Sequence, residues 1–238
     1  MSTVILLCAL ALQAPRVEAR KETLRFASGA RATIHYRRQP AARPEPTRIV
    51  VRTTDGKKVS WNLRRDVMTV TSPGARPAPR RRYRGDERVL TFVRGPSGSG
   101  KSHLARQIKQ ELGERAVILA GDDYFMEGER YVWTRAKYDA SKPWNRDRAA
   151  RAMDSGQLPI IDNTHVTPEQ MALQAQQALE HGYRFRWRNV HTPWATDAEQ
   201  LSRRNSHGTP RPAIDAMVES FKRHQQLNPA EILKASPR

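Results

Sequence analysis

Eight consecutive residues have the types and spacing of a phosphate-binding loop. They fit the pattern G-x-x-x-x-G-K-[ST]. The glycines let backbone N–H groups approach an anion, the lysine can reach the outer phosphates of a triphosphate, and the last hydroxyl can bind magnesium. The loop therefore predicts a site for ATP and Mg²⁺, with a chance match in a flexible loop as the alternative. Its residues are Gly95, Pro96, Ser97, Gly98, Ser99, Gly100, Lys101 and Ser102.

Carboxylates follow two apolar runs that have the composition of buried strands. Asp122 and Asp123 come after the run 116–120, and Asp162 comes after the run 158–161. In an open parallel sheet the carboxyl ends of the strands face the ligand crevice. We expect one acid of the first pair to orient an acceptor hydroxyl and take its proton, and Asp162 to bind Mg²⁺ directly or through water. The alternatives are a helix cap for the first pair and a simple turn for Asp162.

Two arginines end a predicted helix over residues 196–205. Arg203 and Arg204 follow the last core strand, and as a lid they could neutralise charge on a phosphoryl group during its transfer. The equally weighted alternative is that they interact with the dipole of their own helix.

The elements that would position these residues alternate between strand and helix. This order predicts an α/β P-loop domain over residues 86–224, with a mostly parallel sheet flanked by helices. The strand 183–190 is expected at an edge with its arginines facing solvent. The remaining predicted strand is 89–93, and the predicted helices are 102–112, 146–155, 168–179 and 212–223.

Basic residues are concentrated before this domain. Residues 1–85 hold 19 Lys/Arg and 5 Asp/Glu, whereas residues 86–238 hold 23 and 19. The first 71 residues form a basic segment, expected to be a small β unit or partly disordered, and 72–85 an Arg/Pro-rich linker; 225–238 is a short tail. Such an arm favours a nucleic-acid partner over an anionic membrane, with a solvated tail as the alternative.

The chain has one cysteine, Cys8, which excludes a disulfide framework and a cysteine metal site. The apolar run 4–12 is too short to span a bilayer, and no Lys or Arg precedes it as in a signal peptide. We therefore expect an intracellular, cytoplasmic protein.

Several separated motifs over residues 88–223 occur in the order of a known family. Their order resembles the P-loop domain of the Nedd-four binding protein two-like proteins (AAA-type ATP-binding) and, more distantly, the 5′-kinase domain of phage-type polynucleotide kinases. The motifs are GPSGSGKS, GDDYF, PWNRDRAARAMDSG, LPIIDNTHVTPEQM, HTPW and RRNSHGTPRPAIDAM.

The resemblance implies an adenylate-kinase-like fold that transfers the γ-phosphate of ATP to a polynucleotide 5′-hydroxyl with magnesium. By motif, Lys101 and Ser102 would hold the triphosphate and metal, Asp122 would be the general base, and Arg204 the lid arginine. Where the phage-type enzymes have a second lid arginine, this chain has Ser206-His207-Gly208. The alternatives are a kinase for a small molecule and a nucleic-acid-binding module that holds ATP without transferring phosphate.

Overall fold

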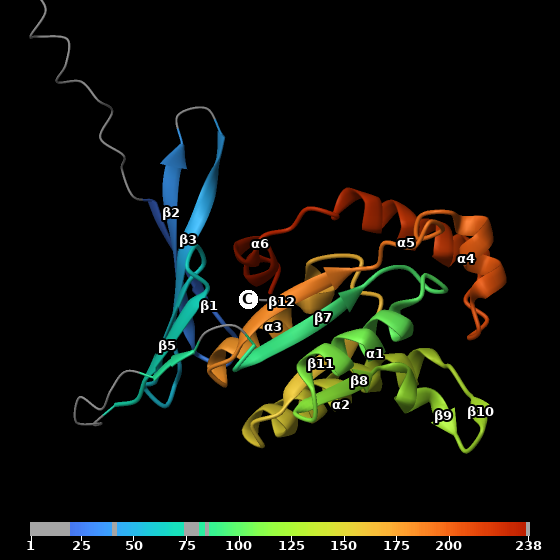
Figure 1. The fold of residues 1–238 in the computed structure, drawn as a ribbon, viewed down its shortest axis with the longest axis horizontal. Helices are drawn as coiled ribbons and strands as arrows, with labels where there is room; N and C mark the ends of the chain where they lie inside the picture. Colours follow the sequence, from blue (N-terminus) through green and yellow to red (C-terminus); the bar gives the residue numbers. More distant parts are fainter. Residues whose placement is uncertain (1–19, 40–41, 74–80, 84–85, 237–238) are drawn as a thin grey trace, which may run out of the picture.

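The computed structural model describes residues 20–39, 42–73, 81–83 and 86–236, which form two large sheets, a separate two-stranded hairpin and several helices (Figure 1). The apolar run 4–12 and Cys8 lie outside the described residues. Within the described part, no helix combines the length and apolar character needed to cross a bilayer.

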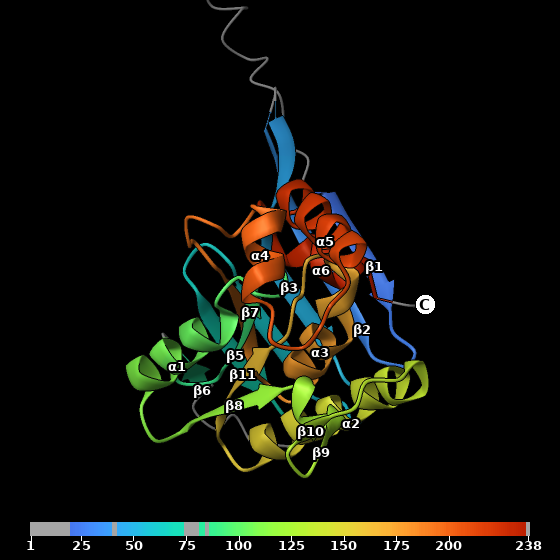
Figure 2. The same ribbon diagram turned by 90° about the vertical axis from the view of Figure 1, so that its right-hand side faces the viewer.

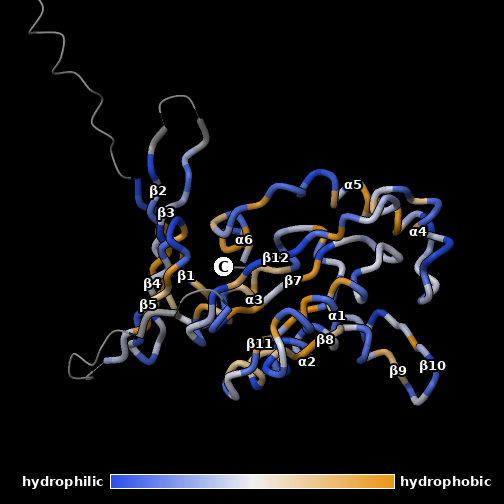
Figure 3. Tube along the Cα trace, viewed as in Figure 1, coloured by the Kyte–Doolittle hydropathy of each residue, from blue (hydrophilic) through white to orange (hydrophobic). Residues whose placement is uncertain are grey.

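A four-stranded parallel sheet forms the centre of the second half of the chain. Its strand order is β12-β7-β11-β8, so the predicted edge position of β12 is confirmed. Every residue of β7 and β11 is buried, as expected for inner strands of a parallel sheet covered on both faces. Figure 3 shows these strands as an apolar centre. The strands are β7 (Val89–Arg94), β8 (Ala116–Ala120), β11 (Leu158–Asp162) and β12 (Arg184–Asn189).

Helices cover both faces of this sheet, which confirms the predicted α/β P-loop architecture. Val93 and Ile160 pack with α1, whereas their neighbours Phe92 and Ile161 belong to the core formed with α2 and α3. Because successive strand residues point to opposite faces, α1 lies on one face and α2 and α3 on the other. The helices are α1 (Lys101–Leu112), α2 (Arg135–Asp154), α3 (Glu169–Glu180), α4 (Ala198–Arg204), α5 (Arg211–Arg223) and α6 (Pro229–Lys234), and Figure 2 shows α4 and α5 side by side.

One helix starts earlier than the sequence predicts, and another forms in the segment expected to be a tail. The predicted helix 146–155 begins eleven residues earlier, because Thr134 caps it by accepting the Lys137 N–H at 3.1 Å and the helix continues through Pro143. In the tail, Asn228 and Glu231 form a reciprocal capping box that starts α6. A short 3-10 helix, η1 (Asp122–Phe125), and a small hairpin, β9 (Met126–Glu127) and β10 (Arg130–Tyr131), lie between β8 and α2.

The basic first part of the chain forms an antiparallel sheet whose six strands follow their sequence order. Its inner face carries apolar side chains such as Ile34, Val51 and Met68, which share one core with α3, α6 and the parallel sheet. Residues 81–83, inside the expected linker, extend this sheet. The strands are β1 (Arg20–Arg25), β2 (Arg31–Gln39), β3 (Ala42–Arg52), β4 (Lys58–Asn62), β5 (Val67–Thr71) and β6 (Arg81–Tyr83).

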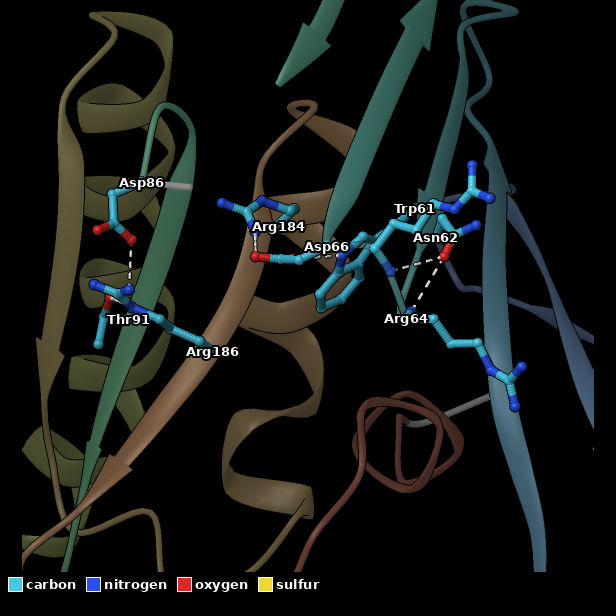
Figure 4. Close-up of polar contacts among 9 residues, drawn as sticks. Trp61, Asn62, Arg64, Asp66, Asp86, Thr91, Arg184 and Arg186 are labelled. Carbon is cyan, nitrogen blue, oxygen red and sulfur yellow. Dashed lines mark hydrogen bonds and ion pairs between the residues drawn. The ribbon is translucent and has the colours of Figure 1, made fainter. Parts of the chain in front are cut away.

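The two sheets meet at the start of β12 (Figure 4). The Trp61 ring packs edge-on against Phe185 with centroids 5.3 Å apart. Arg184 is 4% exposed and pairs with Asp66 in the β4–β5 turn, so the expectation that the β12 arginines face solvent is wrong for this residue. The buried guanidinium has a partner because the turn of the first sheet brings a carboxylate to it.

Candidate active site

The predicted phosphate-binding loop connects the end of β7 to the start of α1. The Gly95 N–H donates to the Thr164 carbonyl at 2.9 Å, which ties the loop to the end of β11. Gly98 has a φ of +79°, and a Cβ there would lie 2.3 Å from the Leu201 carbonyl oxygen of α4. Only glycine therefore allows both this conformation and the close packing of α4 against the loop.

Lys101 begins α1 with its ammonium group folded over the loop. Its Nζ donates to the Pro96 carbonyl at 2.9 Å. Burial lowers the pKa of the ammonium, while the charges of Asp162 and Asp122 act in the opposite direction. A desolvated cation held beside a loop of backbone amides is a suitable partner for phosphate oxygens.

Asp162 ends β11 and is 6% exposed. Burial raises the pKa of its carboxyl, opposed by a hydrogen bond with Ser102 and by the charge of Lys101. Its Oδ1 is buried and has no hydrogen-bond partner among the described residues. A buried carboxylate oxygen left without a donor, next to a serine hydroxyl, fits Mg²⁺ or water bound to it.

Within the described ranges, no group of three or more His, Cys, Asp or Glu side chains could hold a metal. Magnesium is commonly held by one or two protein oxygens together with water and substrate phosphates. The pair Ser102 and Asp162 therefore fits that ion together with a nucleotide.

The two aspartates after β8 face different surroundings. Asp122 accepts a hydrogen bond from the Tyr131 hydroxyl at 3.1 Å, and His207 Nε2 lies 3.7 Å from its other oxygen. Asp123 instead pairs with Arg148 of α2 at 2.9 Å. Only Asp122 of the two contributes to the electrostatic environment of Lys101 and Asp162. The structure therefore separates two aspartates that their position after the strand left equivalent and that only the family resemblance distinguished.

Tyr131 and His207 form a stacked pair above Asp122. Their rings are 4.5 Å apart at an interplanar angle of 27°. Burial, followed by the charge and hydrogen bond of Asp122, raises the pKa of the Tyr131 hydroxyl, which keeps it a donor. The pair brings the β9–β10 hairpin and the segment after α4 together over the carboxylate. Sequence reasoning missed both contacts, although His207 lies within a motif that it quoted.

Arg203 and Arg204 lie on the helix that packs against the loop, but their side chains have other partners. Arg203 pairs with Glu199 one turn earlier, and the Arg204 guanidinium lies 3.9 Å from the centre of the Trp194 ring. Both arginines are exposed. The structure therefore brings together the loop, Asp122 and Asp162. The two arginines instead contact Glu199 and Trp194.

A buried arginine, Arg94, links the ends of β7 and β12 and the segment after β11 through hydrogen bonds. Arg94, fully buried at the end of β7, donates to the His165 carbonyl at 2.8 Å, to Asn189 Oδ1 at 3.0 Å and to the His224 carbonyl at 3.0 Å. Burial lowers its pKa to about 10 and that of His165 to about 4. Sequence reasoning missed the roles of both. Arg94 lies in no quoted motif, and His165 lies within the run LPIIDNTHVTPEQM, where no pattern marks it as a buried residue.

Comparison with known proteins agrees with this architecture. A family model described as an AAA domain matches residues 90–226. Human NEDD4-binding protein 2 is 36% identical over 136 residues, which cover 57% of this chain and 8% of that protein. The chain therefore corresponds to a small part of that relative.

Solved structures with some similarity include a chain of an RNA repair complex and two kinases. A chain of the Pnkp1/Rnl/Hen1 RNA repair complex is 18% identical, with a TM-score of 0.45 over 59% of this chain and 46% of that one. A gluconokinase from Sinorhizobium meliloti 1021 is 17% identical, with a TM-score of 0.42 over 63% and 90%. The APS kinase CysC from Mycobacterium tuberculosis, in complex with AMPPNP and APS, is 25% identical, with a TM-score of 0.39 over 51% and 70%.

Proposed function

The chain belongs to the AAA domain family, and from that membership we propose that it transfers the γ-phosphate of ATP to a hydroxyl acceptor with magnesium. The observation that carries the proposal is the convergence of Lys101, Asp122 and Asp162 beside the glycine-rich loop. A cation, a carboxylate with an unused oxygen and a half-exposed carboxylate are the groups that phosphoryl transfer needs.

Each residue has a role in this proposal. The backbone N–H groups of residues 97–102 and the Lys101 ammonium would bind the triphosphate, and Ser102 and Asp162 would hold Mg²⁺. Bound there, Mg²⁺ would offset negative charge on the phosphate oxygens. Asp122 takes the acceptor's proton as the acceptor oxygen bonds to the γ-phosphorus, and the bond from that phosphorus to the β-phosphate oxygen breaks to release ADP.

Tyr131 and His207 position this base. The tyrosine hydroxyl and the histidine Nε2 lie on the two different oxygens of Asp122, at 3.1 and 3.7 Å. Such contacts restrict the rotation of the carboxylate and so fix the direction in which it accepts a proton. Arg203 and Arg204 would act as a lid only after leaving Glu199 and Trp194, a rearrangement within reach of exposed side chains.

The acceptor in this proposal is a polynucleotide 5′-hydroxyl. The resemblance of the ordered motifs supports it, as does the basic first part of the chain, with 19 Lys/Arg against 5 Asp/Glu in residues 1–85. An anionic polymer would be attracted by that charge, whereas a small neutral sugar would gain nothing from it.

The test is transfer of labelled γ-phosphate to 5′-hydroxyl RNA and DNA oligonucleotides, with wild type, Asp122→Asn, Asp123→Asn and Lys101→Ala. Asp122→Asn should lower turnover about 10²- to 10⁴-fold while ATP binding is retained. Asp123→Asn is the matched control, because that carboxylate faces Arg148, and it should stay within a few-fold of wild type. Lys101→Ala should lose ATP binding.

Equal effects of the two aspartate variants would contradict the assignment of the base. ATP binding without transfer to either oligonucleotide would contradict the polynucleotide acceptor. Small hydroxyl compounds would then be the next acceptors to assay, and absence of transfer to any of them would leave an ATP-binding module.

A further inference from the structure

The antiparallel sheet has one face buried and one face free. Figure 1 shows α3 and α6 on one side of the sheet, and no described helix covers the other. The inward residues of β2 to β5 belong to the core, so the alternate residues of each strand point outward. We call the outward residues of β1 to β5 the outer face.

A row of four cations crosses the outer face from strand to strand. Arg25 of β1 is directly opposite Arg31 of β2, Arg31 is opposite Arg52 of β3, and Arg52 is opposite Lys58 of β4. All four are exposed. At about 4.8 Å between neighbouring strands, the row is about 14 Å long. We call it the first row.

A second basic row runs parallel to the first, four residues further along each strand. Lys21 is opposite His35, and His35 is opposite Arg48. The charges of Lys21 and Arg48, after burial, lower the pKa of His35, which agrees with their closeness. Four residues of strand correspond to about 13 Å, so this is the separation of the two rows.

Between the rows lies a neutral strip of small side chains. Thr23 is opposite Thr33, with their hydroxyl oxygens 3.4 Å apart, and Thr33 is opposite Val50, which is opposite Ser60. Among the outward residues of β1 to β5 whose side chains are described, Glu45 is the single acid, opposite Arg37 and beyond the second row, and none is a Phe, Tyr or Trp. They are Lys21, Thr23, Arg25, Arg31, Thr33, His35, Arg37, Glu45, Arg48, Val50, Arg52, Lys58, Ser60, Asn62, Val67, Thr69 and Thr71.

Like charges directly opposite one another destabilise a sheet, so the first row has a cost that an external anion would offset. We propose that the outer face binds the sugar-phosphate backbones of double-stranded nucleic acid. The rows are about 13 Å apart, close to the roughly 12 Å width of a duplex major groove, so each row can follow one backbone.

The composition of the strip favours a duplex over other polyanions. Single-stranded nucleic acid is usually held by aromatic side chains that stack on bases, and membranes by apolar anchors. The outer face of β1 to β5 has neither, since its aliphatic residues are two half-buried valines, Val50 of β3 and Val67 of β5. Binding would therefore be independent of base sequence and dominated by phosphate contacts.

This face is remote from the phosphate-binding loop. The sheet contacts the first residues of β12, whereas the loop follows the last residue of β7, a parallel strand. The strands point away from the antiparallel sheet (Figure 1). The proposal therefore does not depend on phosphoryl transfer, and it is tested by binding alone.

The experiment measures binding of the full chain to a fluorescent duplex of about 20 base pairs, by anisotropy over a range of salt concentrations. The variant is Arg31→Gln, Arg52→Gln, Lys58→Gln. The control, Lys109→Gln, Arg151→Gln, Lys222→Gln, removes the same charge from three exposed positions on three helices of the other half. ATP affinity of each variant checks that it is folded.

The row variant should bind the duplex at least about 30-fold more weakly near 0.1 M salt and show a logarithmic salt slope smaller by about two to three. The control should stay within about three-fold of wild type. An equal loss in both variants would mean that net charge alone acts, and would overturn the proposal. So would tighter binding to a single strand of equal length, or to phosphatidylserine vesicles, than to the duplex.

Discussion

The ion pair between Arg184 and Asp66 should be a large single contribution to holding the two sheets together. Arg184 is 4% exposed, and its Nε has no partner in the described chain. Asp66 pairs with the guanidinium and also accepts the Trp61 indole N–H at 3.1 Å (Figure 4). The informative change is Asp66→Asn, because asparagine keeps an acceptor for the indole and tolerates the positive φ of 46° while removing the charge.

The expected loss follows from the burial of the two partners. Breaking an ion pair with both charges buried costs about 3–5 kcal/mol. The Asp66 side chain is 56% exposed, so water screens it, and we expect Asp66→Asn to lower the free energy of unfolding by roughly 2 kcal/mol. For a chain of this size that corresponds to a fall in Tm of about 4–8 °C.

Reversible urea unfolding followed by circular dichroism measures this loss. Arg184→Met serves as the companion variant, since it removes the buried charge, fills similar space and leaves Asp66 to water; we expect it to change stability by less than about 1 kcal/mol. Adding Asp66→Asn to Arg184→Met should then cost little more. The reasoning is refuted if Asp66→Asn costs under about 0.5 kcal/mol, or if it costs as much in the Arg184→Met background as alone.

Three further predictions concern the site and the outer face. The pKa of His165 falls from 6.5 to about 4, so the unfolded chain takes up a proton first as pH drops; stability should fall by about 3 kcal/mol from pH 6.5 to 4, and urea unfolding of His165→Asn should show that much less pH dependence. Gly98→Ala should weaken ATP binding in calorimetry at least about 10-fold, because its Cβ would lie 2.3 Å from an α4 carbonyl, whereas Gly113→Ala, with no atom within 4 Å, should not. Arg31→Gln with Arg52→Gln removes three like-charge contacts and should raise stability by about 1 kcal/mol at low salt, a gain that disappears at 1 M salt.

The second half of the chain was predictable because its signals are local. The loop motif, the strand before it and the helix after it lie within about 25 residues, and Asp162 follows directly from its place after an apolar strand. The parallel sheet with helices on both faces confirms this prediction. In such folds the residues that follow parallel strands lie together at one edge of the sheet. The position of a residue relative to its strand therefore predicts whether it lies in the site.

Contacts between distant segments were not predictable in the same way. Tyr131 and His207 are 76 positions apart and meet only because a hairpin and the segment after α4 lie over the same carboxylate. The alternation of arginines with apolar and polar residues in β12 is the same as in an edge strand whose arginines face solvent. Arg184 can be buried because Asp66 of the other sheet pairs with it. The sequence of β12 alone contains no sign of that partner.

The shared core changes how the basic first part of the chain can be tested. Deleting residues 1–85 would appear to isolate its role, since the loop and its acids all lie beyond that point. The deletion would instead expose Phe185, which packs against Trp61, and would leave the buried Arg184 without its carboxylate. Uncompensated burial of a charge destabilises a fold strongly, so the truncated chain would lose activity whether or not the sheet binds nucleic acid. Substitutions on the outer face avoid this confusion, because they remove charge from exposed side chains and leave the inner face of the sheet intact.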